Sequence, residues 1–296
     1  MTDDTELETR ARSGAALTRA EVERLLASSS LADVGSMAEA ARKARRGDTV
    51  TYGVVLAVER RPADLGEAGE IRIVGQPASA EEALDRVRAV APAVRGAPLT
   101  GFALNDLVGL VGGDHLALAA LAHALAGEGL EAVAEAPLDQ LGEPDNALEI
   151  IRAVLHGGLG VWRASVWHAA DMGARLDVIE RAALVHRETG ALRAFAPLPR
   201  EDAAAAPSTG FDDVRTVAAA RFLAAEIPAI QVDWPLYGPK LAQVAIAYGA
   251  DDIDGVAAGD PLSLGRRRSP VEDIERQIRA TFARPCRRNG RYEPQS

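Results

Sequence analysis

Isolated polar side chains that follow apolar, strand-like runs are the residues of this chain whose positions could support chemistry. His168 follows the run Val161–Trp167, and a neutral imidazole there could bind a polar ligand or act as a base. Asp106 and Asp139 also follow strand-like runs, where a carboxylate could orient a sugar or hold a base. The alternatives are a histidine bonded to a neighbouring loop and, favoured for both aspartates, capping of the next helix.

Two more side chains stand at strand ends. Gln76 follows the run IRIVG and could contact a ligand, although a turn role beside Pro77 is an equal alternative. Trp234 follows AIQVD, and an indole there could stack on a planar ring and donate one hydrogen bond. Packing in the core against the last helices is the favoured alternative for this tryptophan.

The residue patterns that mark several common functional sites are absent from this sequence. A zinc site is poorly supported, because no His-x3-His or His-Glu-x2-His pattern occurs. Asp251, Asp252 and Asp254 resemble a metal cluster but lack the EF-hand pattern, so a turn into a short strand is the better interpretation. There is also no Gly-x-Ser-x-Gly elbow and no Walker loop.

Composition narrows the function classes. The chain has 296 residues, 48% of them hydrophobic, and a net charge of −10, with no dense basic patch beyond residues 266–268 and 287–288. It can therefore bury a sizeable core, and nucleic acid is not an expected partner. The acidic start lacks a signal peptide and no apolar run reaches about 18 residues, so no membrane association is expected. One cysteine excludes an intramolecular disulfide and fits a reducing cytoplasm.

The first 58 residues predict helices and then a strand. Residues 1–15 are expected to be disordered or frayed. Thr18 and Glu21 form a capping-box pattern that predicts a helix to Leu26, and a second helix should run from Leu31 to Arg46 and end at Gly47. The run Val50–Val58 is strongly β-prone.

From there on, strands and helices alternate. The predicted strands are Ile71–Val74, Leu99–Leu104, Leu130–Ala134, Val161–Trp167, Leu192–Ala196, Ala229–Val232 and Ile253–Val256. The predicted helices are Ala80–Val94, His115–Gly127, Asn146–His156, Ala174–Thr189, Phe211–Ala225, Pro239–Gly249 and Pro270–Thr281. Such alternation predicts a parallel sheet, and eight units favour a TIM-type (β/α) barrel. We expect one structural domain with a helical lead-in at 1–46, the α/β barrel at 47–262, and a C-terminal helix and tail at 263–296.

The connection between the first two predicted strands does not fit this alternation. Only a dozen residues, ERRPADLGEAGE, separate Val58 from Ile71. A parallel crossover with its own helix needs at least about that many. The barrel is therefore expected to be opened or truncated at its first βα unit.

The run IQVDWPLYGPKLAQVAIAYGADDIDG at 230–255 closely resembles a segment of the radical S-adenosylmethionine (SAM) family of menaquinone biosynthesis, which includes aminofutalosine synthase and dehypoxanthine futalosine cyclase. LADVGSMAEAARKARRGDTVTY at 31–52 and TGFDDVRTVAAARFLAAEIPAIQVDW at 209–234 are also similar to that family. The resemblance covers nearly the whole chain from about Leu31. It implies a barrel of radical-SAM type.

This sequence also departs from the pattern of the family that it resembles. The family holds an iron–sulfur cluster with Cys-x3-Cys-x2-Cys, whereas this chain has only Cys286 and the short ERRPADLGEAGE where the cluster loop would stand. The resemblance therefore implies a degenerate member without the cluster, and no cofactor is expected. The positions that match the family's strand-end motifs are the ligand-binding candidates: Gln76, Asp106, Asp139, His168 and Arg175. Trp234 joins them as the indole candidate.

Two function hypotheses follow. The first is a pseudoenzyme that serves futalosine-route menaquinone biosynthesis by binding a partner, such as a cluster-bearing paralogue, or a small aromatic or nucleoside ligand. The second is a cluster-independent enzyme that acts on a related small molecule, with His168 and a rim carboxylate as its acid–base pair.

Overall fold

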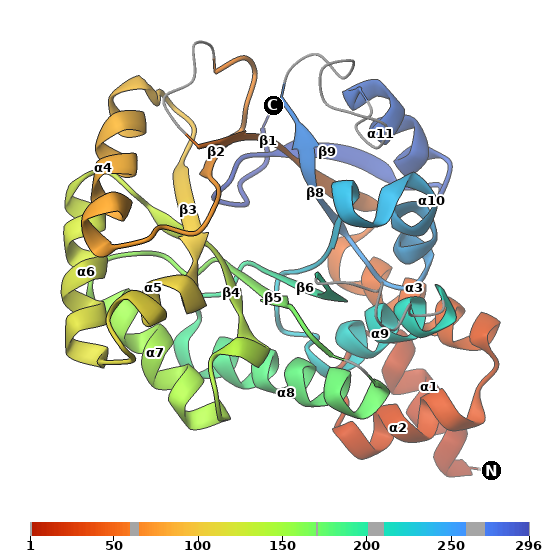
Figure 1. Cartoon of the computed structure of the whole chain (residues 1–296). Coiled ribbons are helices and arrows are strands. Elements are labelled where there is room, and N and C mark those ends of the chain that lie inside the picture. Colours follow the sequence, from red (N-terminus) through yellow and green to blue (C-terminus); the bar gives the residue numbers. More distant parts are fainter. Residues whose placement is uncertain (1, 60–64, 170, 201–209, 259–269, 296) are drawn as a thin grey trace.

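Eight parallel strands close into a barrel (Figure 1). The computed structural model describes residues 2–59, 65–169, 171–200, 210–258 and 270–295. The strands are β1 (Thr49–Val58), β2 (Glu70–Ile73), β3 (Leu99–Ala103), β4 (Ala132–Pro137), β5 (Arg163–Val166), β6 (Ala194–Pro199), β7 (Ala229–Asp233) and β8 (Asp252–Ala257). Each pairs in parallel with the next, and β8 pairs with β1. The predicted (β/α) barrel is confirmed.

Helices cover the outside of the barrel (Figure 1). They are α4 (Ala80–Val90), α5 (Leu104–Leu110), α6 (His115–Gly127), α7 (Pro144–His156), α8 (Met172–Thr189), α9 (Gly210–Leu223), α10 (Trp234–Ala247) and α11 (Val271–Arg279), with short 3-10 turns at Ala91–Ala93 and Leu138–Gln140. Side chains at the N-caps, such as Ser79, Asp114 and Asp171, accept hydrogen bonds from the first turns and fix where these helices begin.

The first βα unit is truncated, as its short connection predicted. The described residues between β1 and β2 contain no helix, and the upper half of β1, from Val55, pairs directly with β2. The lower half of β1 pairs instead with an additional strand, β9 (Arg284–Arg288), in register from Thr49 to Gly53. The barrel is thus closed, and the expectation that it could be opened is wrong.

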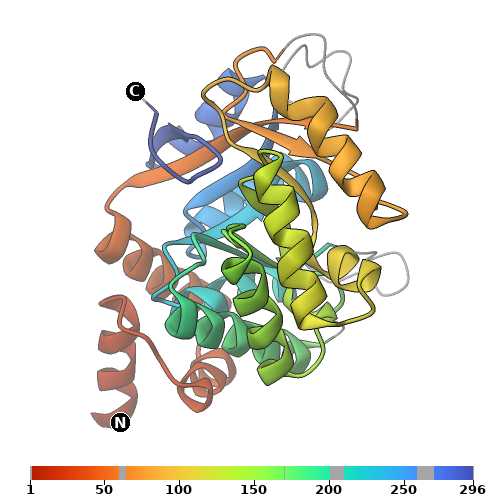
Figure 2. The same ribbon diagram turned by 90° about the vertical axis from the view of Figure 1, so that its left-hand side faces the viewer.

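Three helices precede the barrel: α1 (Thr2–Arg12), α2 (Arg19–Ser28) and α3 (Leu31–Arg46). Figure 2 shows them beside one end of the barrel. The capping box at Thr18 and the helix end at Gly47, with φ 61°, are confirmed. The expected disorder of residues 1–15 is wrong, because Leu7 and Ala11, one turn apart, are buried at 3% and 0% exposure.

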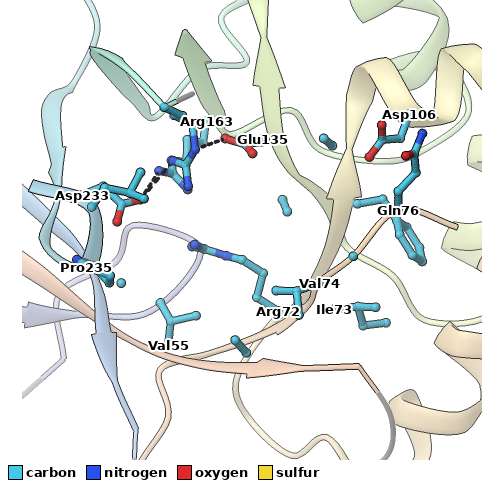
Figure 3. Close-up of a pocket in the computed structure, with 18 of the residues that line it drawn as sticks. Val55, Arg72, Ile73, Val74, Gln76, Asp106, Glu135, Arg163, Asp233 and Pro235 are labelled. Carbon is cyan, nitrogen blue, oxygen red and sulfur yellow. Dashed lines mark hydrogen bonds and ion pairs between the residues drawn. The ribbon is translucent and has the colours of Figure 1, made fainter. Parts of the chain in front are cut away.

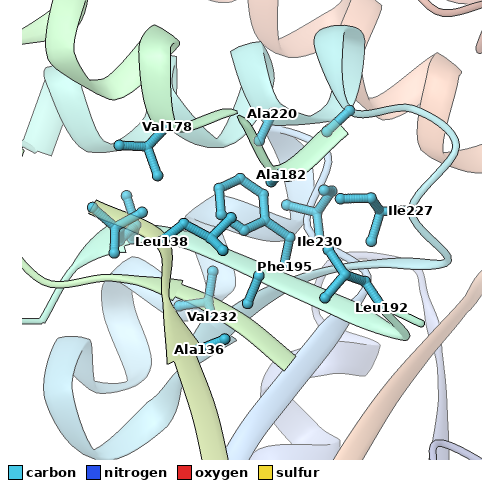
Figure 4. Packing of buried hydrophobic residues seen from close by; sticks show 14 of the residues in the cluster. Ala136, Leu138, Val178, Ala182, Leu192, Phe195, Ala220, Ile227, Ile230 and Val232 are labelled. Carbon is cyan, nitrogen blue, oxygen red and sulfur yellow. The ribbon is translucent and has the colours of Figure 1, made fainter. Parts of the chain in front are cut away.

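The apolar core lies between the strands and their helices. Phe195, Ile230 and Val232 point outward from their strands and pack with Val178 and Ala182 of α8 (Figure 4). Because strand side chains alternate between faces, the neighbouring positions point into the barrel.

The barrel interior is charged. Its buried polar side chains include Glu70, Arg163, Gln231, Asp252 and Asp254. The interior of a TIM barrel is usually filled with branched apolar residues, and the interior of this barrel departs from that pattern.

No single helix among the described residues has the length and apolar character to cross a bilayer, although α5 and α6 taken together, bent by 115°, meet those two criteria.

Candidate functional site

A cavity of about 650 Å³ opens at the carboxyl ends of the barrel strands (Figure 3). Its wall combines the charged Arg72, Arg163 and Asp233 with apolar groups such as Val55 and Phe102. A cavity of this size and mixed lining suits a small molecule, and the carboxyl end of the strands is where barrels of this type carry their sites.

Three arginines of the cavity wall are held by carboxylates. The guanidinium of Arg163 lies 3.0 Å from an oxygen of Asp233 and 3.2 Å from one of Asp254. Arg72 lies 2.9 Å from Asp254, and Arg200 lies 3.0 Å from Asp233. Positive charge in the wall is therefore matched by negative charge from β7 and β8.

Glu135 of β4 completes this charged wall. Its carboxylate lies 3.1 Å from the Nε of Arg200. Burial alone would raise the pKa of Glu135, but Arg200 and Arg163 outweigh that effect and lower it. The same balance holds for Asp254, where Arg72, Arg163 and Arg288 overcome burial and keep the pKa well below its ordinary value.

Asp106 differs from these paired carboxylates. It lines the cavity in the first turn of α5, and its one described side-chain hydrogen bond is a long one, 3.5 Å, from the amide of Asn105. Burial and the negative charge of Glu135 both raise the pKa of Asp106. Such a carboxyl group can take up and release a proton nearer to neutral pH than an exposed aspartate.

Several buried polar atoms of the cavity wall have no hydrogen-bond partner among the described residues. They are the Oδ1 of Asn105, the indole N–H of Trp167 and the Nε–H of Arg163, together with the Oε2 of Glu135, which is ion-paired with Arg200. Buried polar groups are normally paired, so unpaired atoms in residues that line a cavity are unusual. Apart from the carboxylate of Glu135, they comprise one acceptor and two donors.

Backbone strain occurs at the same wall. Phe102, 2% exposed, has φ 62° at the end of β3, directly before the helix that carries Asn105 and Asp106. This conformation is costly for a bulky residue, and such strain tends to gather at binding sites.

The structure brings only two of the sequence candidates into the cavity wall, Gln76 and Asp106. His168 is exposed and lies outside the lining. Asp139 also lies outside it, and its carboxylate accepts the backbone N–H groups of Trp167 and His168 at 2.8 and 2.6 Å.

The favoured capping roles of the two aspartates are wrong. The N-cap of α5 is Ala103 and that of α7 is Glu143. Asp139 instead fixes the loop after β5, which places Trp167 at the cavity.

Trp234 and Arg175 are buried away from the cavity lining. Trp234 is 2% exposed at the start of α10, as the core-packing alternative expected. Arg175 lies 3.2 Å from Asp213 and 2.8 Å from the hydroxyl of Thr216, and so joins α8 to α9.

The arginines and acids of the barrel interior were not among the candidates predicted from the sequence. The sequence feature that could have identified them is charge at alternate positions of a strand: Glu70 and Arg72 in one strand, Asp252 and Asp254 in another. The expected turn into a short strand is confirmed for Asp254, which the predicted strand Ile253–Val256 contained, but β8 already begins at Asp252. The pairing of both aspartates with arginines inside the barrel was not expected.

The residues present do not fit an iron–sulfur cluster. Such a cluster is held by several cysteine thiolates. Cys286, the one cysteine of the chain, lies on β9 opposite Thr51, in the lower half of β1 and far from the carboxyl ends of the strands. Among the described residues, no group of three or more His, Cys, Asp or Glu side chains could hold a metal ion.

Comparison with known proteins gives no matching protein-family model. The chain is 30% identical over 152 residues to the aminodeoxyfutalosine synthase of Streptomyces coelicolor, covering 43% of this chain and 38% of that protein. The chain is related to the aminodeoxyfutalosine synthases. The Thermus thermophilus enzyme is 31% identical over 124 residues, 36% of this chain and 33% of that protein. The predicted family relationship is thereby confirmed, although the matched region spans less than two fifths of each relative.

A second group of relatives is also similar. The 5-amino-6-(D-ribitylamino)uracil–L-tyrosine 4-hydroxyphenyl transferase of Methanothermobacter thermautotrophicus is 33% identical over 133 residues, covering 40% of this chain and 35% of that protein. The relationship therefore extends beyond one named activity.

Solved structures share the fold. Methylornithine synthase (PylB) superposes with a TM-score of 0.66 at 13% identity, covering 95% of this chain and 97% of that one. The FeFe-hydrogenase maturase HydG of Carboxydothermus hydrogenoformans gives 0.64 at 11% identity, covering 96% and 79%. At such identities the likeness concerns the barrel fold alone.

Proposed function

We propose that this chain is a cluster-independent relative of aminodeoxyfutalosine synthase that binds a small planar molecule at the mouth of its barrel. The observation that carries the proposal is the 650 Å³ cavity with unpartnered donors and acceptors, in a chain with a single cysteine. The cavity supports binding, and the missing thiols argue against cluster chemistry. We further propose that it serves as a cytoplasmic accessory protein of futalosine-route menaquinone biosynthesis.

The charge of the cavity wall favours a neutral or zwitterionic ligand. Arg72, Arg163 and Arg200 are each engaged by protein carboxylates, so a phosphate group would have to displace an existing ion pair. The free acceptor of Asn105 and the free donor of Trp167 match the edge of a nitrogen heterocycle. Apolar side chains nearby, such as Phe102, can cover its ring faces.

Calorimetry with two probes tests this proposal. The probes are aminodeoxyfutalosine and 5-amino-6-(D-ribitylamino)uracil, compounds in the names of the relatives. Asn105→Ala should weaken binding roughly 5- to 150-fold, because it removes a buried hydrogen-bond partner. His168→Ala is the matched control and should leave affinity unchanged, since His168 lies outside the cavity lining.

The outcomes separate the hypotheses. Equal affinity of wild type and Asn105→Ala would place the ligand elsewhere. If neither probe binds, the partner-protein form of the proposal becomes the better one, and co-purification of a cluster-bearing paralogue from the native host tests it.

Asp106 supports a second candidate function, a cluster-independent enzyme. Its raised pKa and its place in the cavity wall suit a general acid or base. His168, the partner expected from the sequence, lies outside the lining, so Asp106 would act with another group. Mass spectrometry of the two probes after incubation tests this candidate: turnover that is lost in Asp106→Asn supports it, and unchanged probes contradict it.

A further inference from the structure

The additional strand β9 carries an arginine into the barrel. β9 pairs with the lower half of β1 and ends at Arg288, which is 1% exposed. Its guanidinium donates two hydrogen bonds to Asp252, Nε to Oδ2 at 2.6 Å and Nη2 to Oδ1 at 2.8 Å. Nη2 also donates to the Oδ1 of Asp254 at 3.0 Å.

The guanidinium of Arg288 occupies a space left by Gly53 and covered by the ring of Tyr292. A Cβ atom on Gly53 of β1 would lie 2.5 Å from the Nη1 of Arg288 and 2.8 Å from its Cζ, so only glycine leaves room there. The ring of Tyr292 covers the guanidinium at 4.0 Å, and its hydroxyl accepts a hydrogen bond from Gln231 at 3.0 Å. Glycine inside a strand weakens it, so its presence here has a local reason.

Asp254 links the guanidinium of Arg288 to the arginines of the cavity wall. While its Oδ1 accepts from Arg288, its Oδ2 lies 2.9 Å from Nη1 of Arg72 and 3.2 Å from Nη1 of Arg163. Arg72 and Arg163 line the cavity, whereas Arg288 and Asp254 do not. One fully buried carboxylate is thus shared between an arginine behind the wall and two arginines in it.

Loss of Arg288 would change that sharing. A buried carboxylate that loses a partner is costly and draws its remaining partners closer. Arg72 and Arg163 would then turn toward Asp254. Arg163 would move relative to Asp233, its ion-pair partner in the cavity wall.

We propose that Arg288 is a positioning residue of the binding site: through Asp254 it sets where the guanidinium groups of Arg72 and Arg163 stand in the cavity wall. The C-terminal strand is then a working part of the site although it lies at the other end of the barrel. The effect on ligand affinity rests on the proposed function, whereas the effect on the two arginines does not.

The test uses the full chain with 15N-labelled arginine. Arg288→Met removes the charge, Arg288→Lys keeps it, and Gly53→Ala displaces the guanidinium without removing it. Arg291→Met is the matched control, because Arg291 lies on the same segment but pairs with Glu131 instead, at 2.7 Å. Nε–H resonances of Arg72 and Arg163 are compared by NMR, and affinity for aminodeoxyfutalosine is measured on each folded variant.

Arg288→Met and Gly53→Ala should shift both resonances and weaken binding about tenfold, the effect of a disturbed charged hydrogen bond. Arg288→Lys should restore part of the affinity, and Arg291→Met should match wild type. A purely structural role would lower the melting temperature but leave the affinity of the folded protein unchanged, so that pattern would overturn the proposal.

Two further outcomes are decisive. If wild type does not bind the probe, the proposed ligand fails, and the resonances alone decide on Arg288. If Arg288→Met does not fold, Gly53→Ala and Arg288→Lys carry the test. Unshifted Arg72 and Arg163 resonances in folded Gly53→Ala would contradict the positioning role.

Discussion

Single charged side chains inside strands determine what this barrel can hold. Arg163 and Asp233 occupy inward positions at which an ordinary barrel has apolar residues, and their pairing keeps the cavity wall nearly neutral. The sequence predicted Gln76 and Asp106 because each directly follows a strand. It could not identify Arg163, because the partners of Arg163 lie on β7 and β8, which come within reach only when the barrel is closed.

The two tryptophans near the strand ends illustrate the same limit. In the structure both Trp167 and Trp234 follow a strand directly, whereas the predicted strand Val161–Trp167 included Trp167, and only Trp234 was predicted as a candidate. The backbone that follows each strand determines where the indole lies. Trp234 is the first residue of α10 and is buried in the core, whereas the loop that Asp139 fixes holds Trp167 at the cavity.

Intrinsic fluorescence should distinguish these tryptophans. Trp167→Phe is expected to abolish the fluorescence change on ligand binding, because its indole borders the cavity. Trp234→Phe should keep that change but lower the melting temperature, because it removes buried aromatic volume. A ligand-induced change that persists in Trp167→Phe and vanishes in Trp234→Phe would contradict this assignment.

Local patterns predicted most of the elements. Apolar runs alternating with long helical segments gave the eight parallel strands, and the short connection after Val58 gave the truncated first unit. Besides α5 and the short 3-10 turns, two elements were missed. The strand β9, RPCRR, reads as an exposed charged segment and is stabilised by pairing with β1, over 200 residues away in the chain. The helix α1 is mostly polar and has only two buried apolar residues that signal its contact.

The packing of α1 gives a stability prediction. Leu7→Ala should lower the free energy of unfolding by roughly 2–5 kcal/mol, because it leaves a cavity under α1. Glu8→Ala, an exposed neighbour on the same helix, should change it by no more than about 0.5 kcal/mol. Denaturant unfolding measures both, and equal stability of the two variants would mean that α1 is not docked in solution.

The interior ion pairs make the whole molecule sensitive to acid. The pKa of Asp254 is well below its ordinary value, since Arg72, Arg163 and Arg288 outweigh burial. A carboxylate with a lowered pKa stabilises the fold above about pH 4, and that contribution is lost as the pH falls further. Burial raises the pKa values of Asp106 and Asp251, so these two carboxyl groups lower the stability of the fold when they are ionised. That unfavourable contribution decreases as the pH falls.

Urea unfolding between about pH 3 and pH 6 tests this balance. Wild type should lose stability below about pH 4, and Asp254→Asn, although less stable throughout, should lose less over that interval. Asp145→Asn, a change at an exposed position, should follow the wild-type curve. A decline in Asp254→Asn as steep as in wild type would assign the acid sensitivity to other groups.

The position of Cys286 separates this molecule from cluster chemistry. Its thiol lies on β9 beside the lower half of β1, whereas the cavity opens at the carboxyl ends of the strands. Anaerobic reconstitution with iron and sulfide should therefore give no stoichiometric cluster, because several thiolates are needed to hold one.

Iron and acid-labile sulfide analysis with absorbance spectra measures the outcome of that reconstitution. One cluster per monomer would contradict the prediction. A smaller amount, present only in a dimer and lost in Cys286→Ser, would indicate a cluster shared between two copies through β9. Because Cys286 lies outside the cavity lining, Cys286→Ser should in either case leave the affinity for aminodeoxyfutalosine unchanged, which would separate any iron binding from ligand binding at the barrel mouth.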